Sequence, residues 1–238
     1  MPHACNAFSN GSKALPHWRL TSPSSSLLLV VSDSTGNNVP IIKPITPFSN
    51  PSLVTSGTYT LLGAVLNSPC SEQIVDLLTS IDVTGVSGES LPWNKLQGAV
   101  ATADLEELAH EHHALFVGLG RGELLPYGSV YLTGFLQEKP LADLRTDLQQ
   151  LGFEAAENTH EPEDHAGALC EVMGIMAGSP DDFPHDTQKA FFSRHMGPWM
   201  TEFFDDLIKA RDSGFYRAVG EFGRAFIAME KRYFEMEV

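Results

Sequence analysis

Apolar residues near the C-terminus recur at the spacing of a helix, and this pattern constrains the fold more than any other feature. Apolar pairs repeat about every four residues from Phe191 to Ile208, and a second series follows Gly214: Phe215, Val219, Phe222, Phe226, Ile227, Met229, Tyr233 and Phe234. An α-helix brings residues three and four apart onto one face. We therefore predict one helix that runs through 191–208 and ends at Gly214, and another from 215 onward, each buried along one side.

The middle of the chain shows the same spacing in shorter segments. Asp104 followed by Glu107 is typical of a helix start, and proline at 140 or 162 suits a first helical turn. No alternating pattern of useful length predicts a strand. The sequence therefore predicts an all-α fold, a single compact multi-helix domain over 51–238, with further helices over about 52–68, 71–81, 104–116, 140–151 and 162–176 and loops over 84–92, 118–122 and 179–186.

The first 50 residues have a different composition from the rest. They are rich in serine, proline and asparagine and carry three basic residues against one acidic residue, whereas the remainder carries 12 basic against 29 acidic. Polar, proline-rich segments bury little apolar surface and resist regular structure. We predict that residues 1–50 form a mostly irregular N-terminal extension.

Charge and cysteine content narrow the class of partner. The net charge of −15 argues against nucleic acid and anionic membranes, which both need clustered lysine and arginine, and it favours a cationic partner. The longest aliphatic run near the N-terminus, Leu27–Val31, is too short to span a bilayer. Three scattered cysteines, Cys5, Cys70 and Cys170, indicate reduced thiols. We expect a cytoplasmic protein.

Three motifs suggest catalysis, and each lacks part of its pattern. Gly118–Gly122 does not have the glycine spacing of a dinucleotide loop, and His110–His113 lacks the second histidine of a zinc-protease motif. A triad of Ser129, His165 and Asp164 lacks the nucleophile elbow. We interpret them as a loop, a partly exposed helical histidine cluster and a chance grouping, and we expect no bound metal.

Two other clusters suggest binding. The first places aromatic residues around a turn, in 115–118 and 125–131. The second is Glu161–His165, where Pro162 is expected to start a helix and three carboxylates would lie in or near its first turn, favoured by the helix dipole. The carboxylates could cap the helix or receive guanidinium groups, which pair with carboxylates through two hydrogen bonds.

In this order the clusters resemble the TorD/DmsD/NarJ family of redox-enzyme maturation chaperones. The family's E-P-x-D-H string is complete at Glu161–His165, Pro126–Tyr131 resembles a second signature, and His195–Trp199 resembles its H-x-x-P-W element. The resemblance covers about residues 57–236. Leu125 stands where family members often carry a proline, and residues 1–50 have no recognised counterpart.

The resemblance implies a non-enzymatic chaperone that is a monomer or a domain-swapped homodimer, with residues 179–187 as a hinge. Its partner would be the apo form of a molybdopterin-dependent oxidoreductase and the twin-arginine signal peptide of that enzyme, whose export is delayed until the cofactor is inserted. The molybdopterin would belong to the client, and weak guanine-nucleotide binding is implied by resemblance. The client is expected to be a formate dehydrogenase, or a dimethyl-sulfoxide or trimethylamine-oxide reductase.

Roles follow for individual residues. Asp164 and Glu161 are expected to receive the arginines, and His165 to orient Asp164 or the loop that carries Tyr127. Leu115, Phe116, Tyr127 and Tyr131 are expected to form the walls of an apolar groove, and His195 and Trp199 are further candidates for that wall. Gly128, Ser129 and Pro162 complete the list of candidate binding residues. A structural role is favoured for Trp199. The alternatives are a helical metal- or nucleotide-dependent enzyme and a purely structural helical domain.

Overall fold

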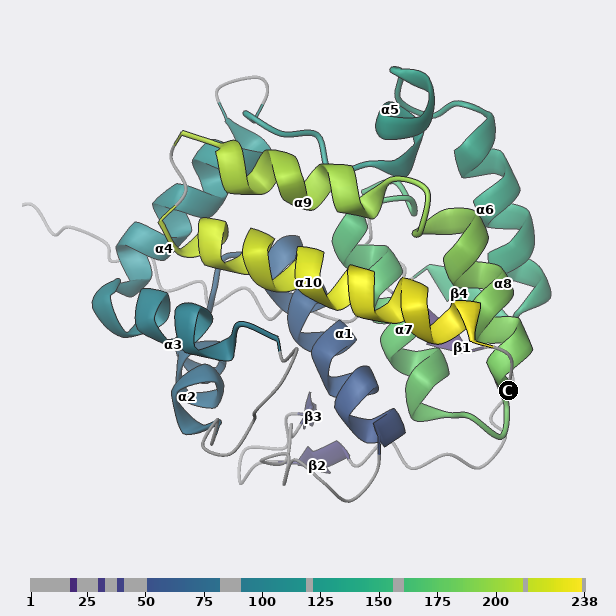
Figure 1. Cartoon of the computed structure of the whole chain (residues 1–238), viewed down its shortest axis with the longest axis horizontal. Helices are drawn as coiled ribbons and strands as arrows, with labels where there is room; N and C mark the ends of the chain where they lie inside the picture. The colour runs from purple at the N-terminus through teal and green to yellow at the C-terminus, as the bar shows by residue number, and fades with distance from the viewer. Residues whose placement is uncertain are drawn as a thin grey trace, which may run out of the picture.

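Helices dominate the computed structural model, which describes residues 18–20, 30–32, 38–40, 51–81, 91–118, 122–155, 161–211 and 214–236 (Figure 1). The all-α prediction is confirmed. The helices are α1 (Pro51–Asn67), α2 (Glu72–Ser80), α3 (Trp93–Thr102), α4 (Leu105–His112), the π-helical η1 (His113–Val117), α5 (Gly128–Thr133), α6 (Lys139–Gln150), α7 (Ala166–Gly178), α8 (His185–His195), α9 (Met200–Lys209) and α10 (Phe215–Glu235).

The centre of the fold is the packing of α1 against α7. Small residues let the two backbones approach: a Cβ at Gly167 would collide with the Asn67 side chain, and one at Gly174 would stand 3.0 Å from the Thr60 hydroxyl. Ser56 Oγ donates to the Gly174 carbonyl at 2.7 Å across this interface. Most residues of α7 are buried, and this helix also contacts α8 and β1.

Helices α9 and α10 lie side by side, and α10 crosses α1 (Figure 1), where the Tyr59 and Phe226 rings pack with centroids 4.6 Å apart. A Cβ at Gly223 would collide with the Phe204 ring, so this glycine allows the close contact. Most of the apolar positions predicted in this region are buried, including Phe203, Leu207 and Phe226. Tyr233 is exposed, contrary to the prediction, and Ile208 and Met229 are partly buried.

The predicted single helix through 191–208 is wrong, because the chain forms α8 and α9 with a break over 196–199. Pro198 has no N–H to donate to residue 194. The Gly197 N–H bonds instead to the Phe192 carbonyl at 2.8 Å. The apolar stripe continues across the break, which is why the periodicity did not reveal it.

Several predicted boundaries are confirmed. Asp104 and Glu107 form a capping box at the start of α4, and Gly152 follows α6 with a φ of 81°. Ser71 caps α2 by accepting the Ile74 N–H. Of the predicted loops, 84–90 and 119–121 lie outside the described residues.

Residues 1–50 contain short strands as well. Strand β1 (Trp18–Leu20) pairs antiparallel with β4 (Phe153–Ala155), and β2 (Val30–Ser32) pairs with β3 (Asn38–Pro40). Trp18 is buried in the core, and its indole N–H donates to the Ala168 carbonyl at 3.1 Å. The prediction of a separate irregular extension therefore misses residues 18–20, which pack on the helical domain. The rest of that prediction falls mostly outside the described residues.

Cys70 and Cys170 are buried free thiols, and Cys5 lies outside the described residues. Within the described ranges, no helix combines the length and apolarity that crossing a membrane requires.

Candidate functional site

A short antiparallel bridge brings the two predicted signatures together. The Gly128 N–H donates to the Asp164 carbonyl at 2.9 Å, and the Ala166 N–H donates to the Pro126 carbonyl at 2.8 Å. Tyr127 and His165 are the bridged residues. The bridge fixes the E-P-x-D-H segment beside the start of α5.

The prediction that Pro162 starts a helix is wrong. The backbone before Ala166 is committed to the bridge, so α7 begins at Ala166, where His165 Nδ1 accepts the Gly167 N–H at 3.1 Å. Pro162 lies in the preceding turn, where its carbonyl accepts the His165 N–H. The carboxylates of this segment therefore do not lie in the first turn of α7, and an imidazole caps the helix.

Asp164 is the buried acid of the bridge, with 3% of its surface exposed. Its Oδ2 accepts the Ser129 N–H at 2.7 Å, and its Oδ1 has no hydrogen-bond partner among the described residues. The Ser129 hydroxyl beside it is also buried without a partner there. Buried polar atoms in folded proteins are nearly always hydrogen-bonded, so each of these two atoms is expected to bond to a water molecule or to a polar group that the described residues do not supply.

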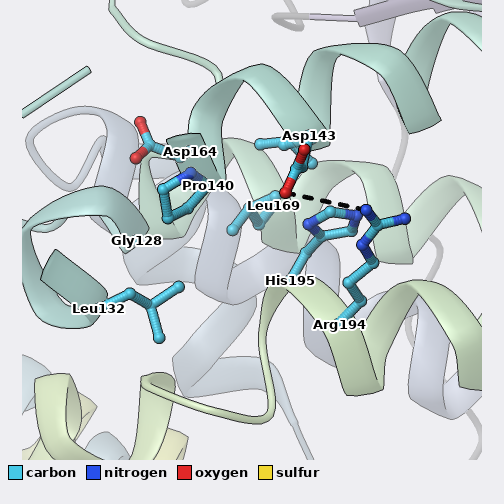
Figure 2. Close-up of a pocket in the computed structure, with 9 residues that line it drawn as sticks. Gly128, Leu132, Pro140, Asp143, Asp164, Leu169, Arg194 and His195 are labelled. Atoms are coloured by element: carbon cyan, nitrogen blue, oxygen red, sulfur yellow. Dashed lines mark ion pairs between the residues drawn. The ribbon is translucent and has the colours of Figure 1, made fainter. Parts of the chain in front are cut away.

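A cavity of about 170 Å³ opens beside Asp164 (Figure 2). It is far larger than the roughly 10–15 Å³ that one water molecule needs. Figure 2 shows Asp164 and Leu132 near one end and the ion pair of Asp143 and Arg194 at the other. The full lining is Gly128, Leu132, Pro140, Asp143, Leu144, Asp164, Leu169, Arg194 and His195.

Asp147 pairs with two residues at the charged end of the cavity, Arg194 and His195. Its carboxylate accepts Arg194 Nη1 at 2.8 Å and lies 2.7 Å from His195 Nε2. Burial lowers the pKa of His195, and this effect outweighs the opposing attraction of Asp147. Arg194 also lies 3.9 Å from Asp143, which receives Lys139 at 3.0 Å. The two cationic side chains at this end, Lys139 and Arg194, are therefore both paired with aspartates of the protein.

Glu161 and Glu163 lie outside the cavity. The Tyr127 hydroxyl donates to Glu161 Oε2 at 2.5 Å, while the Tyr127 ring packs edge-on to His165 at 5.3 Å. Burial, together with Glu161, raises the pKa of Tyr127. Glu163 is paired with Arg145 at 2.7 Å. Of the segment's three acids, Asp164 is the one that lines the cavity.

Trp199 packs against residues that line or adjoin the cavity. Its indole N–H donates to the His195 carbonyl at 2.7 Å, and its ring stacks on Tyr131 at 5.3 Å. Trp199 is almost fully buried, which matches the structural role favoured for it. The Tyr131 hydroxyl lies 3.3 Å from Asp206 on α9, so Tyr131 ties α5 to α9.

Leu115 and Phe116 do not line this cavity, contrary to the predicted groove. Leu115 is 0% exposed, and Phe116 packs against His112 and Tyr216, with ring centroids 5.0 and 5.4 Å apart. Their place is the junction of η1 with α10. The helical register at 105–116 puts both on the buried face.

The sequence analysis missed the walls contributed by α6 and by the end of α5. Asp143 and Asp147 are four residues apart on one face of α6, and this spacing was the available signal. Leu132 lies four residues after Gly128, so both face the cavity.

The histidine cluster is structural. His112 is buried with Nε2 3.4 Å from the Leu66 carbonyl, and burial lowers its pKa to about 4. Glu111 accepts the N–H groups of Phe215 and Tyr216, at 3.1 and 2.7 Å, and so caps α10. No group of three or more metal-ligating side chains occurs in the part of the chain that the structure describes.

Comparisons with known proteins place this helical fold and its paired signatures in a family. The family model described as nitrate reductase delta subunit matches residues 87–205, half of the chain. The chain belongs to this family, the TorD/DmsD/NarJ family of redox-enzyme maturation chaperones.

Its relatives include chaperone protein TorD of Vibrio cholerae, 31% identical over 52% of this chain and 61% of that protein. A candidate Tat proofreading chaperone, DmsD, of Haemophilus influenzae is 27% identical over 67% of this chain and 81% of that protein. The match thus spans under two thirds of the Vibrio chaperone. A solved structure of a candidate redox enzyme maturation protein from Archaeoglobus fulgidus is 18% identical with a TM-score of 0.46, covering 79% of this chain and 99% of that chain.

Proposed function

We propose that this protein is a non-enzymatic cytoplasmic chaperone that binds the twin-arginine signal peptide of a molybdopterin-dependent oxidoreductase and holds the apoenzyme until its cofactor is inserted. The observation that carries the proposal is the carboxylate of Asp164, which lines the cavity with one oxygen left without a hydrogen-bond partner among the described residues. Family membership supports the class of function.

The chemistry of this carboxylate favours a guanidinium ligand. A guanidinium group is permanently charged and presents several N–H donors in one plane. It can bond to Asp164 Oδ1, the carboxylate oxygen that has no hydrogen-bond partner among the described residues and belongs to a residue lining the cavity. The apolar walls formed by Leu144 and Leu169 suit the alkyl stem of an arginine.

Glu161 is suited to the second arginine. It is exposed and lies on the same short segment as Asp164, with its position fixed by Tyr127. As an exposed charge it contributes mainly to encounter rate and specificity, while the buried Asp164 contributes more to affinity. The net charge of −15 favours approach of a cationic peptide in the same way.

The test is the affinity of the full-length chain for a fluorescein-labelled peptide with two arginines followed by an apolar tail, measured by fluorescence anisotropy. Asp164→Asn keeps an acceptor for the Ser129 N–H but removes the charge. We expect it to weaken binding at least about tenfold, because a charge-assisted bond in a buried site is lost.

Glu163→Gln is the matched control. It removes a carboxylate one residue away, but Glu163 is paired with Arg145 and does not line the cavity. Binding is expected to stay within about twofold of wild type. If Asp164→Asn binds the peptide as tightly as wild type while retaining its circular dichroism and melting temperature, the arginine-receptor role is wrong.

The client is to be identified by affinity capture from the native host followed by mass spectrometry. We infer that a formate dehydrogenase, or a dimethyl-sulfoxide or trimethylamine-oxide reductase, is recovered. Light scattering on the purified protein distinguishes a monomer from a swapped dimer, and we expect neither metal nor tightly bound nucleotide in the purified protein.

A further inference from the structure

The end of α5 presents apolar side chains to solvent beside the cavity. Leu132 is 42% exposed, Phe135 69% and Leu136 47%. These three residues, here called the α5 tip, are three of the eight large apolar residues that are exposed among the described residues. Their concentration within five positions distinguishes them from isolated exposed residues, which are common on protein surfaces.

Local hydrogen bonds hold the α5 tip in this position. Gly134 ends the helix with a φ of 83°, and its N–H donates to the Val130 carbonyl at 2.7 Å. Thr133 Oγ1 donates to the Ser129 carbonyl at 2.8 Å and accepts the Phe135 N–H at 3.3 Å. The backbone therefore fixes Phe135 in solvent, although burial of its ring would be favourable.

The α5 tip is continuous with the cavity of Asp164. Gly128 and Leu132 both line the cavity and lie one helical turn apart (Figure 2). Phe135 and Leu136 follow Leu132 in the sequence, after the end of α5. A chain that places a guanidinium on Asp164 can leave the cavity past Leu132 and then meet Phe135. In Figure 1, α5 projects from the body of the fold.

We propose that the α5 tip binds the apolar segment that follows the arginines of the signal peptide. The inference rests on the proposed function and adds the direction of the bound peptide, with arginines at Asp164 and the apolar residues that follow them on Leu132, Phe135 and Leu136. Phe135 is the main anchor, because aromatic side chains carry a large share of interface energy.

The experiment compares two labelled peptides with the same two arginines. One has a tail of alternating leucine and alanine, and the other has a tail of glycine and serine. Phe135→Ser is expected to weaken binding of the leucine–alanine peptide about tenfold, because the ring would be buried by that tail. It should leave the glycine–serine peptide within about twofold, since that tail has no apolar side chain to bury.

Leu105→Ser is the matched control. The exposed fraction of Leu105, 44%, is similar to the 47% of Leu136. Leu105 lies at the start of α4, which is far from α5 in Figure 1. It should change neither affinity. Leu136→Ser is a second test variant and should act like Phe135→Ser with a smaller effect.

Asp164→Asn separates the two proposals, since it should weaken both peptides alike. If it does so while Phe135→Ser and Leu136→Ser weaken neither, the α5-tip inference is wrong and the proposed function stands. If Asp164→Asn weakens neither peptide, the proposed function fails, and the inference fails with it. If light scattering shows a dimer that Phe135→Ser converts to a monomer, the α5 tip is a self-association surface, and the inference is overturned.

Discussion

Gly128 lies directly against the indole of Trp199. A Cβ at position 128 would stand 3.1 Å from the indole Nε1 and 3.2 Å from its Cε2. The same indole donates to the His195 carbonyl, and both Gly128 and His195 line the cavity. Because residue 128 has no side chain, the start of α5 can pack directly against the Trp199 indole. This contact positions one wall of the cavity.

Gly128→Ala is therefore expected to destabilise the protein by about 1–2 kcal/mol in urea unfolding, because the indole must shift to accommodate the methyl group. Peptide affinity should fall as well. Gly98→Ala is the matched control: Gly98 is an exposed residue of α3 with open space around it, so alanine should stabilise by about 0.5–1 kcal/mol through helix propensity. Equal stability of Gly128→Ala and wild type would contradict the close packing.

Glu230 gives stability a dependence on pH. It is buried in α10, where it accepts the Tyr59 hydroxyl at 3.0 Å, and burial raises its pKa from 4.5 to about 7. The folded state then binds this proton more tightly than the unfolded state. Its contribution to the free energy of unfolding is largest below pH 4.5 and is lost as pH rises to about 7.

Glu230→Gln should therefore be more stable than wild type by about 1–3 kcal/mol at pH 8, and the difference should shrink toward pH 4.5. Glutamine keeps an acceptor for Tyr59. Glu235→Gln, at an exposed position of the same helix, is the control and should follow the wild-type profile. Melting temperatures measured from pH 4.5 to 8 test this, and a constant difference at every pH would contradict it.

His112 acts in the opposite direction. Burial lowers its pKa from 6.5 to about 4, so the unfolded state binds the proton more tightly between those values. Stability from this group is complete above pH 6.5 and is lost as pH falls toward 4. His112→Gln should flatten this acid limb in the same melting experiments, while the exposed neighbour variant His113→Gln should retain it. An unchanged acid limb in His112→Gln would show that another group is responsible.

Most helix positions were predictable because they depend on local periodicity and caps. Helices α3 and α5 were not predicted, and α8 and α9 were predicted as one helix. Asp104 with Glu107 marked the start of α4 correctly, since both capping bonds lie within four residues. The start of α7 was not predictable in this way. Pro162 suits a first turn, but hydrogen bonds from Gly128 to Asp164 and from Ala166 to Pro126, remote in sequence, form the bridge at His165, and the helix begins after it.

The candidate site was predicted only in part, because its sequence motifs are local whereas the exposure of its side chains depends on the fold. The signature strings brought Tyr127, Ser129, Asp164 and His165 into consideration, and the bridge places them together. The α5 tip was missed, because the exposure of Phe135 follows from the turn at Gly134 rather than from the apolar pattern. Leu115 was wrongly assigned to the groove. From the sequence alone, an apolar residue next to a binding motif cannot be assigned to the core or to the surface.

Trp18 joins the N-terminal region to the helical domain. It lies in a segment that appears irregular by composition, yet its ring is buried edge-on to Phe153 at 6.3 Å, and its N–H bonds to the Ala168 carbonyl on α7. The pairing of β1 with β4 closes a long loop, so the contacts must offset a substantial loss of chain entropy. This favours a contribution to stability from residues 18–20.

Trp18→Ala is expected to lower the free energy of unfolding by about 3 kcal/mol, because it removes a buried indole and a hydrogen bond beside the start of α7. Trp18→Phe keeps most of the apolar surface and loses the donor, so it should cost about 1 kcal/mol. Urea unfolding of both variants against wild type measures the difference. Because Ala168 lies four residues after Asp164, loosening this contact should also weaken arginine-peptide binding in Trp18→Ala more than in Trp18→Phe. If both variants unfold and bind like wild type, residues 18–20 contribute nothing to the fold, and the helical domain from α1 onward supports the site alone.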